Sequence, residues 1–280
     1  MNWEYPARLL CRTLNVSHSG YYDWRQRQAH PGRRRLEDAL LAEQIQQVHQ
    51  QSRRTYGSPR IQQVLQRGGH SHGRNRIARL MRQLQLVGRE RRRYRVLTTD
   101  SHHDHPVAPN RLAEHPAPDG PNQVWVTDIT YVLTGEGWLY LAGVLDLYSR
   151  QIVGWAMDQN IDTRLVLASW QMAVGRRRPG PRLLVHSDRG CQYASAEFRR
   201  ALQEHQAVAS MSRKANCYDN AAMESFWSTL KHELIHRSKF RTRAEAKNAI
   251  FDFIEVFYNR TRLHSSLNYL SPVDFENQNN

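Results

Sequence analysis

The spacing of apolar and polar positions divides the 280-residue chain into a helical first part and a mixed second part. Up to about residue 95 the apolar residues recur at helical spacing, and from about residue 122 short apolar runs alternate with longer helical stretches. Between these parts lies a stretch rich in proline and histidine with no apolar period, which predicts a linker. The predicted segments are 1–51, 52–95, the linker 96–120, and 121–280 with its C-terminal helices.

The mixed part has strand and helix signals in a definite order. Strands are predicted at 124–133, 138–148, 151–157, 182–188 and 208–211, and helices at 162–175, 195–206, 219–236 and 242–258. Gly135 and Gly137 predict a hairpin turn between the first two strands. Three strands followed by alternating helices and strands is the layout of a ribonuclease-H-like α/β domain, a mixed sheet flanked by helices.

Residues 58–95 show a helix–turn–helix pattern within a small all-α region. Ser58 before Pro59 predicts a helix start, and Gly68 with Gly69 predicts its end. Apolar residues are expected inward, and four arginines of the second helix are expected outward: Arg74, Arg76, Arg79 and Arg82. The tail with Arg91, Arg92 and Arg93 has the composition of a phosphate-binding arm. An ordinary helical hairpin with a basic face explains this pattern equally well.

Charge is distributed unevenly along the chain. The net charge is +14, and the first 115 residues carry 21 arginines, no lysine and nine acids, so they account for +12 of it. A basic first part favours a nucleic acid as partner. The three cysteines are scattered, which argues against a disulfide framework or a zinc module. No apolar run of about 18 residues occurs, so we expect a cytoplasmic protein without a membrane span.

Three acids stand at positions where chemistry is expected. Asp128 lies within an apolar strand, Asp188 ends the fourth strand, and Glu224 lies on the helix after the fifth. In this strand order the first and fourth strands are neighbours, so we expect the three carboxylates to converge. Two unit charges about 4 Å apart repel by roughly 4 kcal/mol at an effective dielectric of 20, and a divalent cation reverses the sign. Carboxylate oxygens suit Mg²⁺ or Mn²⁺, and two such ions catalyse in-line displacement at phosphorus.

The acids also occur in a characteristic sequence context. Asp188 and Glu224 have 35 residues between them, the spacing of the D,D(35)E signature of retroviral integrases and many transposases, and Lys231 follows Glu224 by seven positions. The surrounding segments VWVTDITYV, HSDRGCQYAS, SRKANCYDNAAMESFWSTLKHE and FYNRTRLHSSLNYLSPVDF resemble the downstream-frame (OrfB) transposases of the IS3 insertion-sequence family. Residues 55–86 resemble that family's helix–turn–helix segment, so the resemblance covers nearly the whole chain.

The resemblance implies a role for each matching residue. Asp128, Asp188 and Glu224 match the catalytic acids, and Lys231 matches the residue expected to contact DNA near the cleaved phosphate. The implied function is an insertion-sequence transposase, which binds the terminal inverted repeats of its element and catalyses metal-dependent DNA cleavage and strand transfer. Its expected partners are double-stranded DNA at element ends and target, further copies of itself on DNA, and an upstream-frame segment as a fusion.

Three further residues have open roles. Asp146 is either structural, with Arg150 as a partner, or a fourth metal-binding acid. His186 and Asn220 either orient a water or phosphate, or satisfy backbone groups. A ribonuclease-H-like nuclease or junction resolvase is the alternative that a metal-binding Asp146 would favour. A non-catalytic DNA-binding regulator is the other alternative, and the intact set of acids argues against it.

Overall fold

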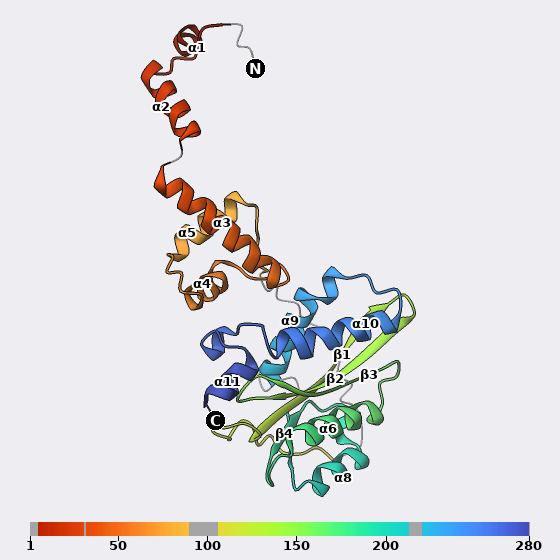
Figure 1. The fold of residues 1–280 in the computed structure, drawn as a ribbon. Helices are drawn as coiled ribbons and strands as arrows, with labels where there is room; N and C mark the ends of the chain where they lie inside the picture. The colour runs from red at the N-terminus through yellow and green to blue at the C-terminus, as the bar shows by residue number, and fades with distance from the viewer. Residues whose placement is uncertain (1–4, 31, 90–105, 213–219, 280) are drawn as a thin grey trace. The chain divides into compact units, whose positions relative to one another are not determined.

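The computed structural model describes residues 5–30, 32–89, 106–212 and 220–279, and these form two compact units, 1–88 and 89–280. Figure 1 shows helices in the first unit and a sheet with helices on both faces in the second. Within the described ranges no helix has the length and apolar character needed to cross a bilayer. The α/β fold class expected for the second unit, preceded by a helical region, is confirmed.

The first unit consists of helices. They are α1 (Ala7–Thr13), α2 (His18–Ala29), α3 (Arg33–Gln51), α4 (Ser58–Arg67) and α5 (Arg74–Gln83). The helix predicted from Ser58 begins there, but its N-cap is Gly57, because the backbone of Gly57 is still extended (φ −91°, ψ 178°). Gly68 caps its C-terminus as expected, and Gly69 follows with a left-handed φ of 82°.

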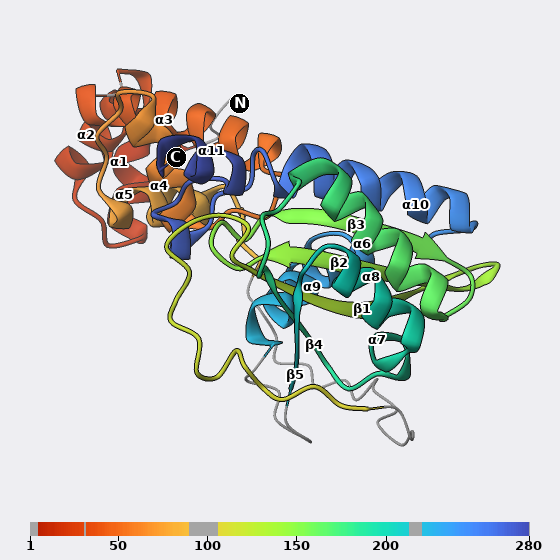
Figure 2. The ribbon, with the colours of Figure 1, turned by 90° about the horizontal axis from the view of Figure 1, so that it is seen from below.

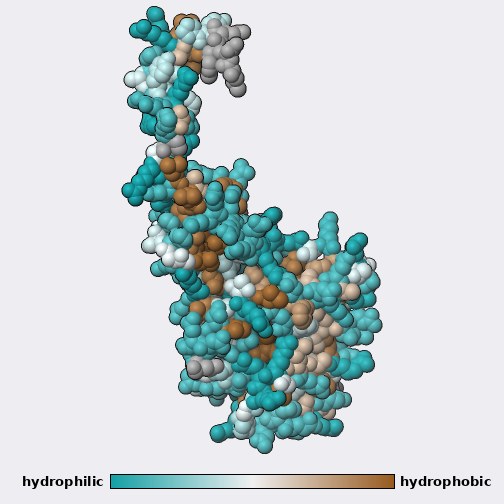
Figure 3. All heavy atoms as spheres, viewed as in Figure 1, coloured by the Kyte–Doolittle hydropathy of each residue, from teal (hydrophilic) through white to brown (hydrophobic). Residues whose placement is uncertain are grey.

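Helices α3, α4 and α5 share a small apolar core. It is made by Leu41 and Ile45 from α3, Ile61 and Leu65 from α4, and Ile77, Leu80 and Met81 from α5. The first half of α3 does not take part, since Leu36 and Leu40 are exposed, and Figure 3 shows apolar side chains at the surface there. The stable core of this unit therefore begins near the middle of α3.

The second unit is built on a five-stranded sheet. Its strands are β1 (Val124–Thr134), β2 (Gly137–Asp146), β3 (Ile152–Asp158), β4 (Leu184–Ser187) and β5 (Val208–Met211). Their order is β3-β2-β1-β4-β5, as Figure 2 shows, with antiparallel pairs β3-β2 and β2-β1 and parallel pairs β1-β4 and β4-β5. The predicted pairing of the first and fourth strands is confirmed. It places β1 at the centre of the sheet, with β4 beside it.

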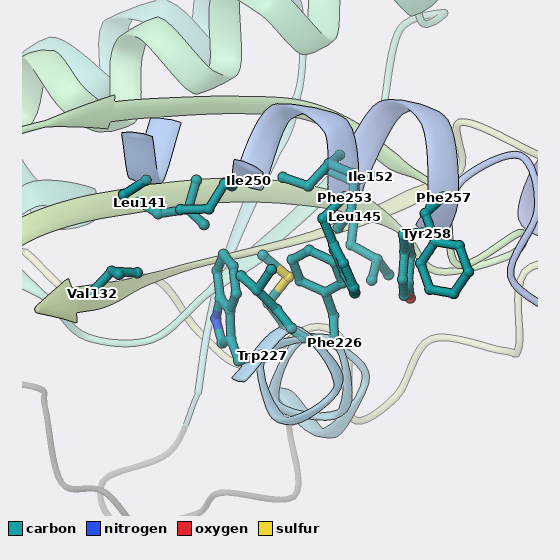
Figure 4. Close-up of a cluster of buried hydrophobic side chains, with 14 of the residues drawn as sticks. Val132, Leu141, Leu145, Ile152, Phe226, Trp227, Ile250, Phe253, Phe257 and Tyr258 are labelled. Atoms are coloured by element: carbon teal, nitrogen blue, oxygen red, sulfur yellow. The ribbon is translucent and has the colours of Figure 1, made fainter. Parts of the chain in front are cut away.

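Helices cover both faces of this sheet. One face packs against α6 (Thr163–Arg177), α7 (Cys191–Ala194) and α8 (Ala196–Glu204). The other packs against α9 (Ala221–Glu233), α10 (Arg243–Phe251) and a π-helix, η3 (Asp252–Tyr258). Figure 4 shows Phe226 of α9 facing Phe253 of η3, and Trp227 of α9 lying on the side of Leu141 and Val132. The apolar layer between this face of the sheet and helices α9, α10 and η3 holds α9 against the sheet, next to the strand that carries Asp128.

Several predicted boundaries differ from the observed ones. The helix expected at 195–206 is preceded by α7, because Ser195 is extended and its hydroxyl accepts from the amide of Phe198, starting a new helix. The helix expected at 242–258 turns into η3 after Phe251. A short 3₁₀-helix, η2 (Ile235–Arg237), follows α9, and η4 (Ser265–Leu267) and α11 (Pro272–Asn279) complete the chain.

The predicted linker lies partly outside the described residues. From 106 to 120 it contains no helix or strand. This stretch is nevertheless attached to the second unit, because the backbone amides of Arg111 and Leu112 both donate to Ser210 Oγ of β5, at 3.0 and 3.2 Å. Its C-terminal half is therefore part of the sheet-containing unit.

Candidate active site

Asp128 lies in the middle of β1, on the face covered by α9. Side chains alternate across a strand, so Asp128 shares its face with Val126 and Val132, which belong to the apolar layer beneath α9. Its carboxylate is half-buried, and its Oδ2 accepts a hydrogen bond from Trp227 Nε1 at 3.0 Å. An indole of α9 thus holds the carboxylate of β1.

Gly143 of β2 is the residue paired with Asp128 across the sheet. A Cβ at this position would lie 2.5 Å from Met223 Cε and 3.0 Å from the Trp227 ring. Because Gly143 has no side chain, α9 packs directly on the sheet there. This close approach brings the Trp227 indole within reach of Asp128.

Asp188 follows β4 by one residue. The parallel register pairs Val126 with His186, and continuing it by two residues places Asp188 beside Asp128. Asp188 Oδ1 accepts from the amide of Gly190 at 2.9 Å, which fixes the turn between β4 and α7. The two aspartates therefore occupy neighbouring strands on one edge of the apolar layer.

Glu224 lies in the first turn of α9 and is exposed. Across the described ranges, no set of three or more His, Cys, Asp or Glu side chains is close enough to hold one metal ion. The expected convergence of all three carboxylates on one point is thus not seen. The structure brings Asp128 and Asp188 together and places Glu224 on the adjacent helix.

The electrostatics of the site perturb Asp128 strongly. Desolvation, and secondly the negative charge of Asp188, raise the pKa of Asp128 to about 8. Burial also raises the pKa of the Tyr193 hydroxyl, with the charges of Asp128 and Asp188 adding to it, and this hydroxyl lies 3.1 Å from Thr127 Oγ1. Burial likewise raises the pKa of Glu224. A concentration of negative potential is typical of a cation site.

Lys231 lies on α9 two turns after Glu224. Its ammonium group stands 5.2 Å from the centroid of the Tyr131 ring of β1. Desolvation lowers the pKa of Lys231, and the charge of Asp128 opposes that shift. Lys231 therefore supplies a partly desolvated positive charge in the electrostatic neighbourhood of Asp128.

Comparison with known proteins assigns both units to known domain families. Models of the integrase core domain match residues 118–217 and 224–279, and an HTH-like domain matches residues 35–94. A 31 kDa protein of insertion element IS600 from Shigella sonnei, described as uncharacterized, is 45% identical over 266 residues, covering 95% of this chain and 97% of that protein. Transposase InsF for insertion sequence IS3A from Escherichia coli K12 is 38% identical over 276 residues, covering 99% of this chain and 96% of that protein. This chain belongs to the IS3 family of insertion-sequence transposases.

Among solved structures, the HTLV-2 integrase catalytic core domain in complex with magnesium aligns with 56% of this chain and 97% of its own, at 13% identity and a TM-score of 0.44. The IS3-family relatives carry the functional assignment. The chain is a DDE-type polynucleotidyl transferase with an integrase core and an HTH-like DNA-binding domain.

Asp146 of this transposase points away from the other acids. It pairs with Trp125 across the sheet, on the face covered by α6, whereas Asp128 is on the face of α9. Its carboxylate is fully buried and accepts from the Asn122 amide at 2.7 Å, the Tyr148 amide at 2.9 Å and Trp125 Nε1 at 3.2 Å. The nearby cation is Arg177 of α6, at 4.0 Å, and not the expected Arg150. This environment favours the structural role.

His186 and Asn220 are both buried and both engaged with the protein. The ring nitrogens of His186 lie 2.9 Å from Ser210 Oγ and 3.0 Å from Ser212 Oγ. Asn220 donates from Nδ2 to the carbonyl of Thr127 at 3.3 Å, one residue before Asp128. Its Oδ1 is buried and has no hydrogen-bond partner among the residues that the structure describes. Both side chains tie neighbouring elements to the strands that carry the aspartates.

The arginines predicted to bind DNA fall into two groups. Arg74 and Arg82 of α5 are exposed, as expected. Arg76 and Arg79 are instead partly covered and pair with Asp38 of α3, at 2.7 and 2.6 Å. Two of the four arginines are thus exposed as expected. The other two form ion pairs with Asp38 of α3 and are partly covered. Arg91, Arg92 and Arg93 lie outside the described residues.

Trp227 is a site residue that the sequence analysis missed, although it stands one helical turn after Glu224. We expect Trp227→Phe to weaken Mg²⁺ binding by about 10-fold or more, because residues that orient a metal ligand typically contribute that much. Isothermal titration of Mg²⁺ measures this. Trp155→Phe is the matched control, since the Trp155 indole donates to Glu255 at 2.7 Å and to none of the three acids. Equal Mg²⁺ affinity in both variants would contradict a positioning role.

The raised pKa of Asp128 predicts how metal binding depends on pH. Between its ordinary value of 3.8 and about 8, the folded metal-free protein retains a proton that the unfolded chain has released. Metal-free stability therefore falls as pH rises through this window, and a cation must displace the proton below about pH 8. We expect Mg²⁺ to raise the melting temperature more at about pH 9 than at about pH 6. Asp128→Asn should remove this difference, and an equal Mg²⁺ effect at both pH values would refute the assignment.

Proposed function

We propose that Asp128, Asp188 and Glu224 form the catalytic centre with which this transposase cleaves and joins DNA at the ends of its element. The observation that carries the proposal is the placement of Asp128 beside Asp188 on parallel neighbouring strands, with the helix of Glu224 tied to Asp128 through Trp227. The negative charges of Asp188 and Glu224 help to raise the pKa of Asp128, and a cation bound beside Asp128 would relieve that repulsion.

The donor chemistry suits Mg²⁺ or Mn²⁺: Asp128 and Asp188, with Glu224 from the adjacent helix, would hold two such ions. Hard oxygen donors suit these cations, and the raised pKa of Asp128 marks a site whose negative charge lacks compensation. When bound, such ions supply activation of the attacking oxygen and stabilisation of the leaving oxygen at a phosphodiester.

The residues around the acids have distinct parts in this proposal. The Trp227 indole keeps the Asp128 carboxylate oriented. Lys231 presents its ammonium group to a phosphate of the DNA strand, since it is desolvated and stacked on Tyr131. The Asp188 carboxylate keeps its orientation through the amide of Gly190.

Two successive reactions are proposed at this centre. Water forms a bond to phosphorus at the element end and the bond to the 3′ oxygen breaks, leaving a 3′-OH. That hydroxyl then attacks the phosphorus of a second phosphodiester. A new P–O bond forms to the attacking oxygen, and one existing ester P–O bond of that phosphodiester breaks. The HTH-like domain would hold the terminal inverted repeats, in the cytoplasm where the bacterial chromosome lies. Because two ends are joined, at least two protomers are proposed to assemble on the DNA, with an upstream-frame segment as a fusion partner.

A supercoiled plasmid carrying the element's ends tests the reaction class. The purified chain with Mn²⁺ should produce nicked and joined DNA, and an RNA–DNA hybrid should remain uncut. Cutting of the hybrid alone would favour a ribonuclease H. Binding without any nicking would favour the regulator and overturn the proposed chemistry.

A further inference from the structure

Helices α1 and α2 have the local geometry of a helix–turn–helix, and this pair lies outside the matched family models, which cover residues 35–94, 118–217 and 224–279. Four residues, 14–17, separate the two helices. Helix–turn–helix units have a turn of three or four residues, whereas six residues separate α4 from α5. By turn length, the first pair fits the motif better than the second.

The turn itself is built by specific backbone interactions. Asn15 adopts a left-handed conformation with φ of 52°. The amide of Val16 donates to the carbonyl of Cys11 and that of Asn15 to Arg12, at 3.0 and 3.3 Å, which together form a Schellman motif. Ser17 then caps α2 by accepting from the Gly20 amide at 3.1 Å. The direction of α2 relative to α1 is therefore set by the turn.

The surface of α2 is exposed on nearly all sides, and the side opposite Tyr21 is its open side. None of the residues of α2 is buried, and Tyr21 is the least exposed of them. At about 100° per residue, Ser19, Asp23 and Gln26 fall on the side opposite Tyr21, with Tyr22 beside them. The Tyr22 ring is 45% exposed and is held 4.8 Å from the His18 ring. This open side carries donors and acceptors suited to base edges, since glutamine pairs with adenine and aspartate accepts from cytosine.

The charge around this pair suits a polyanion. Residues 5–29 contain four arginines and one acid, and three more arginines follow at 33–35. Arg35 is tied to the end of α2, donating to Gln28 Oε1 at 2.9 Å and to the Arg27 carbonyl at 3.3 Å. Arginines are thus concentrated on α2 and in the segments beside it, where they would contact the phosphates of a DNA backbone.

We propose that α1 and α2 form a second DNA-reading helix–turn–helix, with α2 in the major groove, so that this transposase recognises each element end through two separate blocks of sequence. The inference rests on the proposed binding of element ends. It assigns one block to α2 and the other to the HTH-like domain of residues 35–94.

In vitro selection from a random duplex library, with the full chain in EDTA, tests the proposal. The wild-type chain should enrich a motif of two blocks. The triple variant Ser19→Ala, Tyr22→Ala, Gln26→Ala should lose one block and bind the wild-type motif at least about 10-fold more weakly. The control variant Glu197→Ala, Gln203→Ala, Glu204→Ala removes three exposed polar side chains from α8, outside both proposed reading segments, and should enrich both blocks.

A second pair of variants tests the turn without touching the open side of α2. Asn15→Gly keeps the left-handed conformation accessible and should retain both blocks, whereas Asn15→Val strains it and should lose the α2 block. Unchanged selection by the triple variant would overturn this inference. A changed association between protomers with an unchanged motif would also overturn it and assign the face to protein contact. If the wild-type chain enriches no motif, the proposed binding of element ends fails as well.

Discussion

Asp128→Asn is expected to reduce strand cleavage and strand transfer by on the order of 10³-fold or more while leaving duplex binding unchanged. Asparagine preserves the size of the side chain and can still accept from Trp227, so the change removes mainly the negative charge. Asp188→Asn and Glu224→Gln should have the same effect. Gel analysis of labelled element ends with Mn²⁺ measures the chemistry, and a mobility shift in EDTA measures binding.

Asp146→Asn is the matched control for these variants. It makes the same chemical change at a buried aspartate of the same sheet, but on the opposite face. We expect it to lower stability and to retain the rate per folded molecule. Strand transfer that survives in Asp128→Asn, or that is lost specifically in folded Asp146→Asn, would contradict the assignment of the triad.

Glu233→Ala is expected to lower the free energy of unfolding of the second unit by about 3–5 kcal/mol. Glu233 ends α9 and receives two hydrogen bonds from Arg262, at 2.7 and 2.9 Å, and both side chains are buried. Removing the carboxylate leaves a buried guanidinium without its main counter-charge. For a unit of this size the loss corresponds to a fall in melting temperature of roughly 6–20 °C, measurable by calorimetry.

Two controls separate the ion pair from general damage. The double variant Glu233→Leu, Arg262→Met replaces both charges by apolar groups of similar volume and should recover most of the lost stability. Arg241→Ala removes an exposed pair with Glu245 in the same unit and should cost less than about 1 kcal/mol. If Glu233→Ala and Arg241→Ala lower the free energy of unfolding equally, the buried pair contributes no more to stability than the exposed pair.

The order of elements in the second unit could be predicted because strand and helix periods are local. β1 and β5 end within one residue of the predicted bounds, and the adjacency of the first and fourth strands follows from the known layout of the fold class. The break between α7 and α8 was missed, since it depends on whether Ser195 caps a new helix or continues the previous one. The π-helical turns of η3 were also missed, because they share the apolar pattern of α10.

Side-chain partners across the fold were harder to predict. A spacing of four residues suggested Arg150 as the partner of Asp146, but that rule applies to helices. Here the chain leaves β2 at Asp146, and Arg150 has a left-handed φ of 62°, so Arg177 of α6 approaches instead. In the same way Asp38, which is remote in sequence, forms ion pairs with Arg76 and Arg79. Such pairs depend on tertiary packing, which periodicity does not encode.

The absence of a side chain at Gly143 has a consequence for how this enzyme can be altered. The distance between α9 and the sheet is set at a position that has no functional group, and Glu224, Trp227 and Lys231 all move with that helix. A single methyl group at residue 143 would therefore shift an acid, an indole and an ammonium together relative to Asp128. Tolerance of mutation in this transposase should therefore be low at a position where nothing reacts, and a screen for inactive yet folded variants should recover substitutions of this glycine alongside those of the three acids.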